Sequence, residues 1–60
     1  MTASELRRKL AKAGCTFEDR KKHTRVFYQG QESHIPRHPS KELKKGTVQG
    51  ILKQLGDPPI

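Results

Sequence analysis

The chain has 60 residues and a formal net charge of +7, with 32% of its residues charged and 30% hydrophobic. A chain of this length holds one small domain, expected to span residues 1–60, and its surplus of cations favours a polyanion such as nucleic acid as partner. The single cysteine excludes an internal disulfide, and no segment approaches the roughly 20 apolar residues of a membrane-spanning helix, so a cytoplasmic protein that does not associate with membranes is expected.

A helix is expected in the first segment, TASELRRKLAKAG. Thr2 and Glu5 have the spacing of a capping box, in which each side chain bonds the backbone N–H of the other residue. Leu6 and Leu10 recur at helical spacing and form a narrow apolar stripe, while Gly14 supplies a stop signal. Arginine and lysine cover much of the remaining helix surface.

Three short strands are expected next, in the segments CTFE, HTRVFY and ESHIP, because their side chains alternate in polarity. Gln29-Gly30, between the second and third strands, fits a two-residue hairpin turn. Pro36 lacks a backbone N–H and is expected to close the third strand. A basic loop, RHPSKELKKG, follows and is expected to hold one helical turn.

The last element is expected to be a helix in the segment GTVQGILKQLG. Thr47 is the predicted N-cap, and Gly56 is the predicted stop. Gly50 lies inside this helix, where glycine is unfavourable relative to alanine, and we expect it to admit a closely approaching backbone. The apolar face is formed by residues at helical spacing, which are Val48, Ile51, Leu52 and Leu55.

The element order is therefore helix, strand, strand, strand, helix. The simplest packing for this order is an α+β domain with a three-stranded antiparallel sheet and both helices on one face. Two helices of this length can cover only one side of so small a sheet. The other side should therefore stay open to a ligand.

Strand register decides which side chains lie on that open face. A two-residue turn at Gln29-Gly30 places Arg25 opposite His34, and successive side chains alternate between the two faces. The set expected under the helices is Thr24, Val26, Tyr28, Ser33 and Ile35. The set expected on the open face is His23, Arg25, Phe27, Glu32 and His34.

The side chains of the open face suit RNA cleavage without a metal ion. In such a reaction the substrate's 2′-hydroxyl is the nucleophile, histidine transfers protons near neutral pH, and lysine or arginine stabilises charge on the phosphate. A two-metal nuclease would need paired carboxylates, whereas the acidic residues of this chain are scattered. The cysteine and the histidines also lack the spacing of a zinc site, so no metal or cofactor is expected.

Less specific interpretations fit the same residues. A histidine at a strand edge is usually an ordinary surface residue, and Phe27 on an open face can serve a protein interface instead of stacking on a base. Two alternatives exist for the whole chain. One is a non-catalytic RNA-binding module that uses the same basic face, and the other is a protein-interaction domain whose charge serves an acidic partner.

The segment IPRHPSKELKKGTVQGILKQLG resembles the signature of the HicA-type (YcfA-like) mRNA interferase toxins, and SELRRKLAKAGC is similar to the N-terminal part of that family. The resemblance covers nearly the whole chain and implies a double-stranded-RNA-binding-domain-like fold with the element order given above. It also implies a toxin of a bacterial type II toxin–antitoxin pair. Such a toxin is an endoribonuclease that cleaves mRNA independently of the ribosome, arrests translation and is neutralised by a HicB-type antitoxin covering its active site.

The catalytic histidine of that family opens the second strand, and His23 has this place here. The family commonly has a small, glycine-led turn before the histidine, whereas this chain has Arg20-Lys21-Lys22, which should attract phosphate more strongly. We therefore predict that His23 acts as general base or acid, with His34 and Arg25 as candidate accessory groups. The residues predicted to bind RNA are Lys21, Lys22, Arg25, Phe27, Arg37, Lys41, Lys44 and Lys45.

Overall fold

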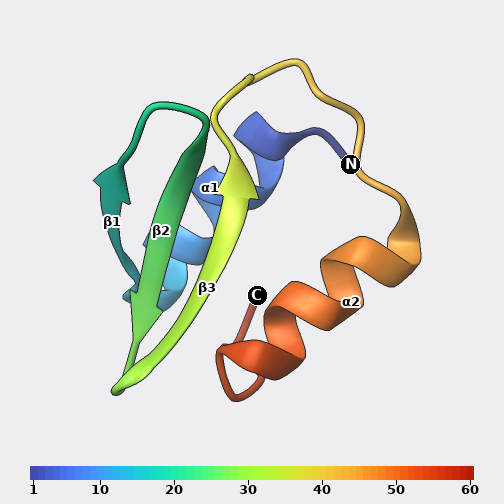
Figure 1. The fold of residues 1–60 in the computed structure, drawn as a ribbon. Helices are drawn as coiled ribbons and strands as arrows, with labels where there is room; N and C mark the ends of the chain where they lie inside the picture. Colours follow the sequence, from blue (N-terminus) through green and yellow to red (C-terminus); the bar gives the residue numbers. More distant parts are fainter.

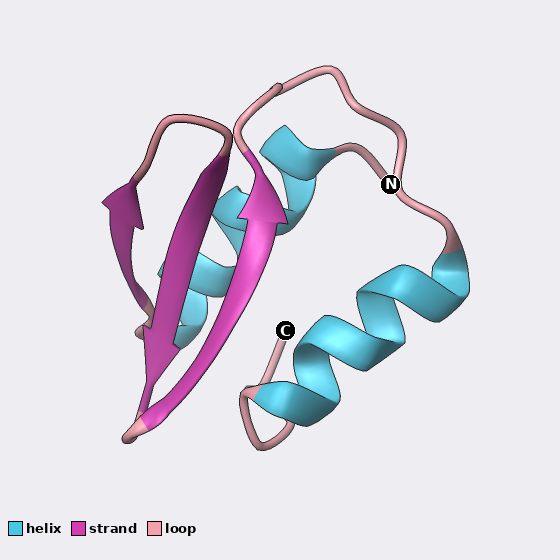
Figure 2. Cartoon of the chain, in the orientation of Figure 1, coloured by secondary structure: helices cyan, strands magenta, loops and turns pink.

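The computed structural model describes all 60 residues, and its elements follow in the expected α-β-β-β-α order (Figure 1). The elements are α1 (Ala3–Ala13), β1 (Thr16–Asp19), β2 (His23–Tyr28), β3 (Gln31–Pro36) and α2 (Lys45–Gln54). The strands form one antiparallel sheet in the order β1-β2-β3 (Figure 2). The predicted α+β fold class is therefore confirmed. Neither helix is both long enough and apolar enough to cross a membrane.

The predicted capping box starts α1. The side chain of Thr2 accepts a hydrogen bond from the Glu5 N–H at 3.2 Å, and the Glu5 carboxylate accepts one from the Thr2 N–H at 3.1 Å. Two backbone donors at the start of the helix are thus satisfied, and the bond from the Thr2 backbone lowers the pKa of the Glu5 carboxyl. Gly14 ends the helix with a φ of +102°, in the left-handed region that favours glycine.

The β2–β3 hairpin has the predicted register. Its two-residue turn places Gln29 at φ +46° and Gly30 at φ +82°, and two consecutive left-handed residues are typical of the tight turns whose twist matches paired strands. Arg25 consequently lies opposite His34. The two faces of the hairpin differ in burial as predicted. The side chains expected under the helices are buried, apart from half-buried Tyr28, whereas those expected on the open face are exposed or half-buried.

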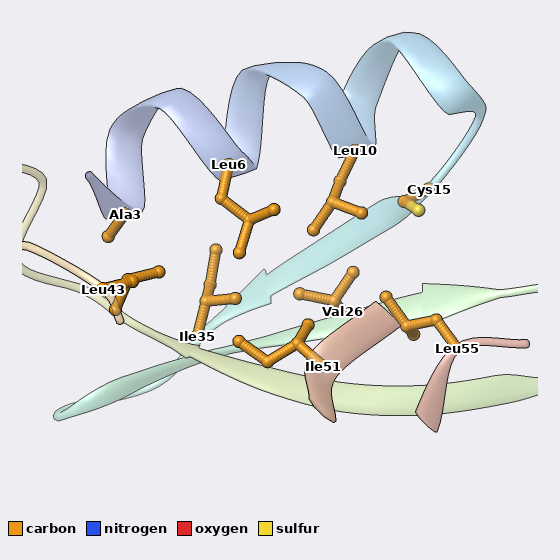
Figure 3. Packing of buried hydrophobic residues seen from close by; sticks show 9 residues of the cluster. All are labelled: Ala3, Leu6, Leu10, Cys15, Val26, Ile35, Leu43, Ile51 and Leu55. Atoms are coloured by element: carbon orange, nitrogen blue, oxygen red, sulfur yellow. The ribbon is translucent and has the colours of Figure 1, made fainter. Parts of the chain in front are cut away.

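Both helices bury apolar side chains against the same face of the sheet (Figure 3). The cluster consists of Ala3, Leu6, Leu10, Cys15, Val26, Ile35, Leu43, Ile51 and Leu55. Ser33, a buried polar residue of β3, donates a hydrogen bond to the side-chain oxygen of Gln54 in α2 at 2.6 Å. Because both helices serve this one face, the opposite face of the sheet stays free of them.

Helix α2 begins earlier than predicted. Its N-cap is Lys44, whose side chain makes no capping hydrogen bond, and the Val48 N–H already donates to the Lys44 carbonyl at 3.0 Å. The prediction of Thr47 as N-cap is therefore wrong. The reason is that Leu43 is buried and its N–H donates to the Met1 carbonyl at 2.8 Å, which fixes the chain just before the helix.

The loop between β3 and α2 holds no helical turn, so this expectation is wrong as well. The loop makes a tight turn, in which the Lys41 N–H donates to the His38 carbonyl at 3.1 Å. It then runs antiparallel to the N-terminus, where the Ala3 N–H donates to the Lys41 carbonyl at 2.8 Å and Thr2 pairs with Glu42. These bonds occupy backbone groups that a helical turn would need.

Gly50 faces open space. A Cβ atom at this position would contact nothing within 4 Å, so the prediction that another backbone approaches closely here is wrong. Gly14 has equally open surroundings, but its φ of +102° is one that side chains rarely adopt. The two glycines thus differ in backbone conformation rather than in the space around them, which makes them a matched pair for substitution.

Replacing Gly50 with alanine should stabilise the protein, because alanine loses less conformational entropy in a helix and has room here. We expect Gly50→Ala to raise the free energy of unfolding by about 0.5–1 kcal/mol. Gly14→Ala should lower it, since alanine is strained at positive φ. Urea denaturation followed by circular dichroism measures both changes, and a destabilised Gly50→Ala variant would show that this side of α2 is occupied.

Candidate active site

Polar and aromatic side chains of β2 and β3 project from the helix-free face of the sheet, which is called the open face below. They are His23, Arg25, Phe27, Glu32 and His34. The rings of His23 and His34 have centroids 6.3 Å apart and meet edge to face at 74°. They are diagonal neighbours, because His34 lies opposite Arg25, two residues after His23. Both imidazoles are exposed, so both can reach one phosphodiester lying on the sheet.

Arg25 is held by two carboxylates. Its Nε and Nη2 atoms donate to the two oxygens of Glu32, both at 2.8 Å, and its Nη1 atom donates to Glu18 Oε1 at 3.4 Å. The guanidinium also lies 5.2 Å from the centre of the Phe27 ring. The hydrogen bonds between Arg25 and Glu32 lower the pKa of the carboxyl and raise the pKa of the guanidinium. A phosphate could bind Arg25 only by sharing or displacing these contacts.

The centre of the open face is electrically balanced as a result. Glu18 Oε1 also forms an ion pair with Arg20, whose Nη2 atom lies 2.7 Å away. Glu32 Oε2 also lies 3.8 Å from Nε2 of His34. Two carboxylates therefore offset the two arginines next to the histidines.

Glu18 and Glu32 shape this face, although sequence patterns did not mark them as functional. The contact of Glu32 could have been found from the hairpin register, because Glu32 lies diagonal to Arg25. The contact of Glu18 depends on the β1–β2 register, which pairs it directly with Arg25 and which no turn motif specifies. With the histidines nearby, these carboxylates still form no group of three or more side chains that could hold a metal ion.

The turn that carries His23 is tied to the end of β3. Within the turn, the Arg20 N–H donates to the His23 carbonyl at 2.8 Å. From just beyond β3, Nη1 of Arg37 donates to the Arg20 carbonyl, also at 2.8 Å. No local pattern signals this contact, since the two arginines are 17 residues apart in the chain. Arg37, which the sequence led us to expect as an RNA ligand, is thus bonded to the protein backbone.

The other basic residues predicted to bind RNA fall into two groups. Lys21 and Lys22 are exposed in the β1–β2 turn, directly before His23. Lys41 lies in the loop after β3, and Lys44 and Lys45 lie at the start of α2, which Figure 1 places on the other side of β3 from that turn. No salt bridge involves a lysine side chain, so these charges are available to a ligand.

Asp19 anchors the β1 side of the turn. Its Oδ1 atom accepts a hydrogen bond from Thr24 Oγ1 at 2.7 Å and one from Arg7 Nη1 at 3.0 Å. The bond from buried Thr24 is the larger cause, and the bond from Arg7 the next, of a pKa for the Asp19 carboxyl below its ordinary 3.8. Since folding favours the ionised form, the carboxylate stabilises the fold above about pH 4, and this contribution is lost as the pH falls through the folded-state pKa.

Acid should therefore destabilise the protein partly through Asp19. We expect the free energy of unfolding to fall as the pH is lowered from about 5 to 2, and to fall less steeply in Asp19→Asn, which has no carboxyl to protonate. Thr24→Val removes the same hydrogen bond from the other side and should flatten the slope too. Urea denaturation across this pH range provides the measurement, and an Asp19→Asn variant with the full parental slope would contradict the assignment.

The chain is similar to known proteins over nearly its whole length. Residues 3–56 match the family model for the HicA toxin of bacterial toxin–antitoxin pairs. The probable mRNA interferase HicA 2 of Photorhabdus laumondii is 45% identical over 56 residues, which cover 93% of this chain and 97% of that protein. The probable mRNA interferase toxin HicA of Escherichia coli K12 is 39% identical, again over 93% of this chain and 97% of its own length.

A solved structure shares the fold as well as the sequence pattern. A chain in the crystal structure of the E. coli HicAB toxin–antitoxin complex is 39% identical to this one, with a TM-score of 0.84. The match covers 90% of this chain and 95% of that chain, so it concerns the whole domain rather than one motif. By its sequence and by its fold, the chain belongs to the HicA toxin family.

Proposed function

We propose that this chain is an mRNA interferase, an endoribonuclease that cleaves mRNA independently of the ribosome and arrests translation in the bacterial cytoplasm. Membership of the HicA family supports the proposal, since its relatives bear the name of probable mRNA interferases. The observation that carries it is the place of His23. This residue is exposed at the start of β2 on a sheet face without helices, with a second imidazole centred 6.3 Å away.

The proposed reaction uses the substrate's own 2′-hydroxyl as nucleophile. His23 removes the 2′-hydroxyl proton as general base, and the O2′–P bond forms while the P–O5′ bond breaks. A second group gives a proton to the leaving O5′ atom, which balances the proton that His23 takes. The products are a 2′,3′-cyclic phosphate and a 5′-hydroxyl end. Metal-bound water is not required, because the nucleophile comes with the RNA.

His34 is the group to which we assign the proton donation. Its ring centre is 6.3 Å from that of His23, and its Nε2 atom lies 3.8 Å from the Glu32 carboxylate. The two rings lie on neighbouring strands of the open face, so each can approach a different oxygen of one phosphodiester.

Phosphate binding falls mainly to the lysines. Lys21 and Lys22 attract the RNA backbone next to the catalytic histidine, and the lysines of the loop after β3 and of the α2 start extend the track. Phe27 offers a ring on which a base can stack, with the Arg25 guanidinium 5.2 Å from its centre. Because Arg25 is already bound by carboxylates, its contribution to RNA binding requires these contacts to be shared or displaced.

The same proposal includes a HicB-type antitoxin that neutralises the chain by covering the open face. The related solved structure is that of a toxin–antitoxin complex. A partner seated on the open face would hide His23 and keep RNA away from the lysines of the β1–β2 turn. The net charge of +7 favours an acidic contact surface on that partner.

His23→Ala should abolish cleavage while the fold stays intact, because the imidazole is exposed and outside the core. Loss of a general base commonly lowers the rate about 10²–10⁴-fold, and we expect a loss in that range. His38→Ala is the matched control, since it removes another exposed histidine, one that contacts Ser40 in the loop after β3. Initial rates on purified RNA in the presence of EDTA measure the effect, as does growth of cells that lack the antitoxin.

Cleavage by His23→Ala at the parental rate would show that the assignment is wrong. RNA that the parent protein binds but does not cut would instead indicate a non-catalytic RNA-binding module. His34→Ala tests the proton donor separately, because a large loss of rate supports His34 and an unchanged rate leaves the role to a lysine.

A further inference from the structure

Arg37 holds the turn from which His23 projects. Its Nη1 atom donates to the Arg20 carbonyl at 2.8 Å, and the N–H of the same Arg20 donates to the His23 carbonyl at 2.8 Å. The regular pairing of β2 with β3 ends at His23 and Pro36, so beyond this pair the Arg37 side chain joins the two segments. One side chain thus links the end of β3 to the residue that is hydrogen-bonded to His23.

At the tip of this turn, neither lysine side chain forms a salt bridge. Lys21 and Lys22 are exposed and carry adjacent positive charges, which repel each other. The Arg20 side chain points to Glu18 on the sheet, with Nη2 2.7 Å from Oε1, and so does not close the turn itself. The bond from Arg37 goes to a backbone carbonyl, and it therefore restrains the main chain of the turn rather than only a side chain.

We propose that Arg37 is a positioning residue for catalysis by His23 and is not one of the phosphate ligands of the RNA. The catalytic part of this proposal rests on the proposed function, whereas its structural part can be tested without RNA. Holding the turn fixes the backbone of His23 relative to His34 and to the substrate. Displacing a catalytic group by about 1 Å can lower the rate about 100-fold, so a modest loosening of the turn should be measurable.

Arg37→Ala and Arg8→Ala form a matched pair for the test. Arg8 is also an exposed arginine, but it lies on α1 and forms no salt bridge. The first readout is kcat and KM for cleavage of a short RNA. The second is the salt dependence of binding to a 2′-O-methyl RNA, which lacks the nucleophile. The third is hydrogen exchange of the Arg20 amide followed by NMR, with circular dichroism to check folding.

For Arg37→Ala we expect kcat to fall about 10–100-fold while KM changes less than about twofold. The salt dependence should stay parental, and the Arg20 amide should exchange faster. Arg8→Ala should match the parent in every readout. If Arg37 instead binds a phosphate of the RNA, Arg37→Ala should raise KM and reduce the slope of log affinity against log salt by about 0.7. The Arg20 amide would then exchange as in the parent. That result, or an Arg37→Ala variant that behaves like Arg8→Ala, would overturn the proposal.

Failure of the proposed function gives a different pattern. If the parent protein cuts no RNA, the kinetic readout is absent for every variant, but the Arg20 amide still reports on the turn. Faster exchange in Arg37→Ala then supports the link between Arg37 and the backbone that carries His23. Parental exchange overturns it, whatever the protein does to RNA.

Discussion

The two-residue turn at Gln29-Gly30 is the constraint on which the rest of the site depends. Because side chains alternate between faces along a strand, a slip of one residue would carry the histidines under the helices and bring aliphatic side chains to solvent. Left-handed backbone at both turn residues fixes the register locally. Burial of Val26 and Ile35 fixes it a second time, since each would lose its contacts with the helices after a slip. The position of His23 is therefore set by core packing as well as by the turn.

The open face and its borders carry two kinds of cation, namely arginines paired with carboxylates and lysines without such a partner. Glu18 and Glu32 offset Arg20 and Arg25 beside the histidines, whereas the lysines at the edges have no ion-pair partner. Exposed ion pairs contribute little to stability, so the value of this network lies in the geometry that it gives Arg25 and in the local balance of charge. The net charge of +7 is thus unevenly distributed, with unpaired lysines in the β1–β2 turn directly before His23.

Features with signals inside a few residues could be predicted from the sequence, and features built by distant contacts could not. The capping box at Thr2 and the hairpin turn are local, and both formed as expected. The start of α2 was misplaced because it depends on a hydrogen bond between Leu43 and Met1, at the far end of the chain. Gly50 was expected to contact another backbone because glycine is unfavourable inside a helix, so its presence there suggested a packing role. The structure shows no atom near enough to give it that role.

The same division applies to the candidate site. The alternation of side chains along the strands was enough to place His23 and His34 on the open face, because the Gln29-Gly30 turn sets the register of both strands. The pairing of Arg25 with Glu18 requires the β1–β2 register, and the bond from Arg37 to the turn spans 17 residues, so neither has a sequence pattern of its own. The sequence therefore did not reveal which partners the charged side chains have, and these partners determine how free each side chain is to bind a ligand.

The proposed reaction uses the 2′-hydroxyl of the RNA as nucleophile, with His23 as the group that activates it on the open face. The most direct measurement compares an all-ribose RNA with the same RNA carrying one 2′-deoxy residue on the 5′ side of a mapped cleavage site. We expect cleavage at this bond to be lost while other bonds are still cut, leaving 2′,3′-cyclic phosphate and 5′-hydroxyl ends. Continued cleavage at the substituted bond, or products with 5′-phosphate ends, would contradict it.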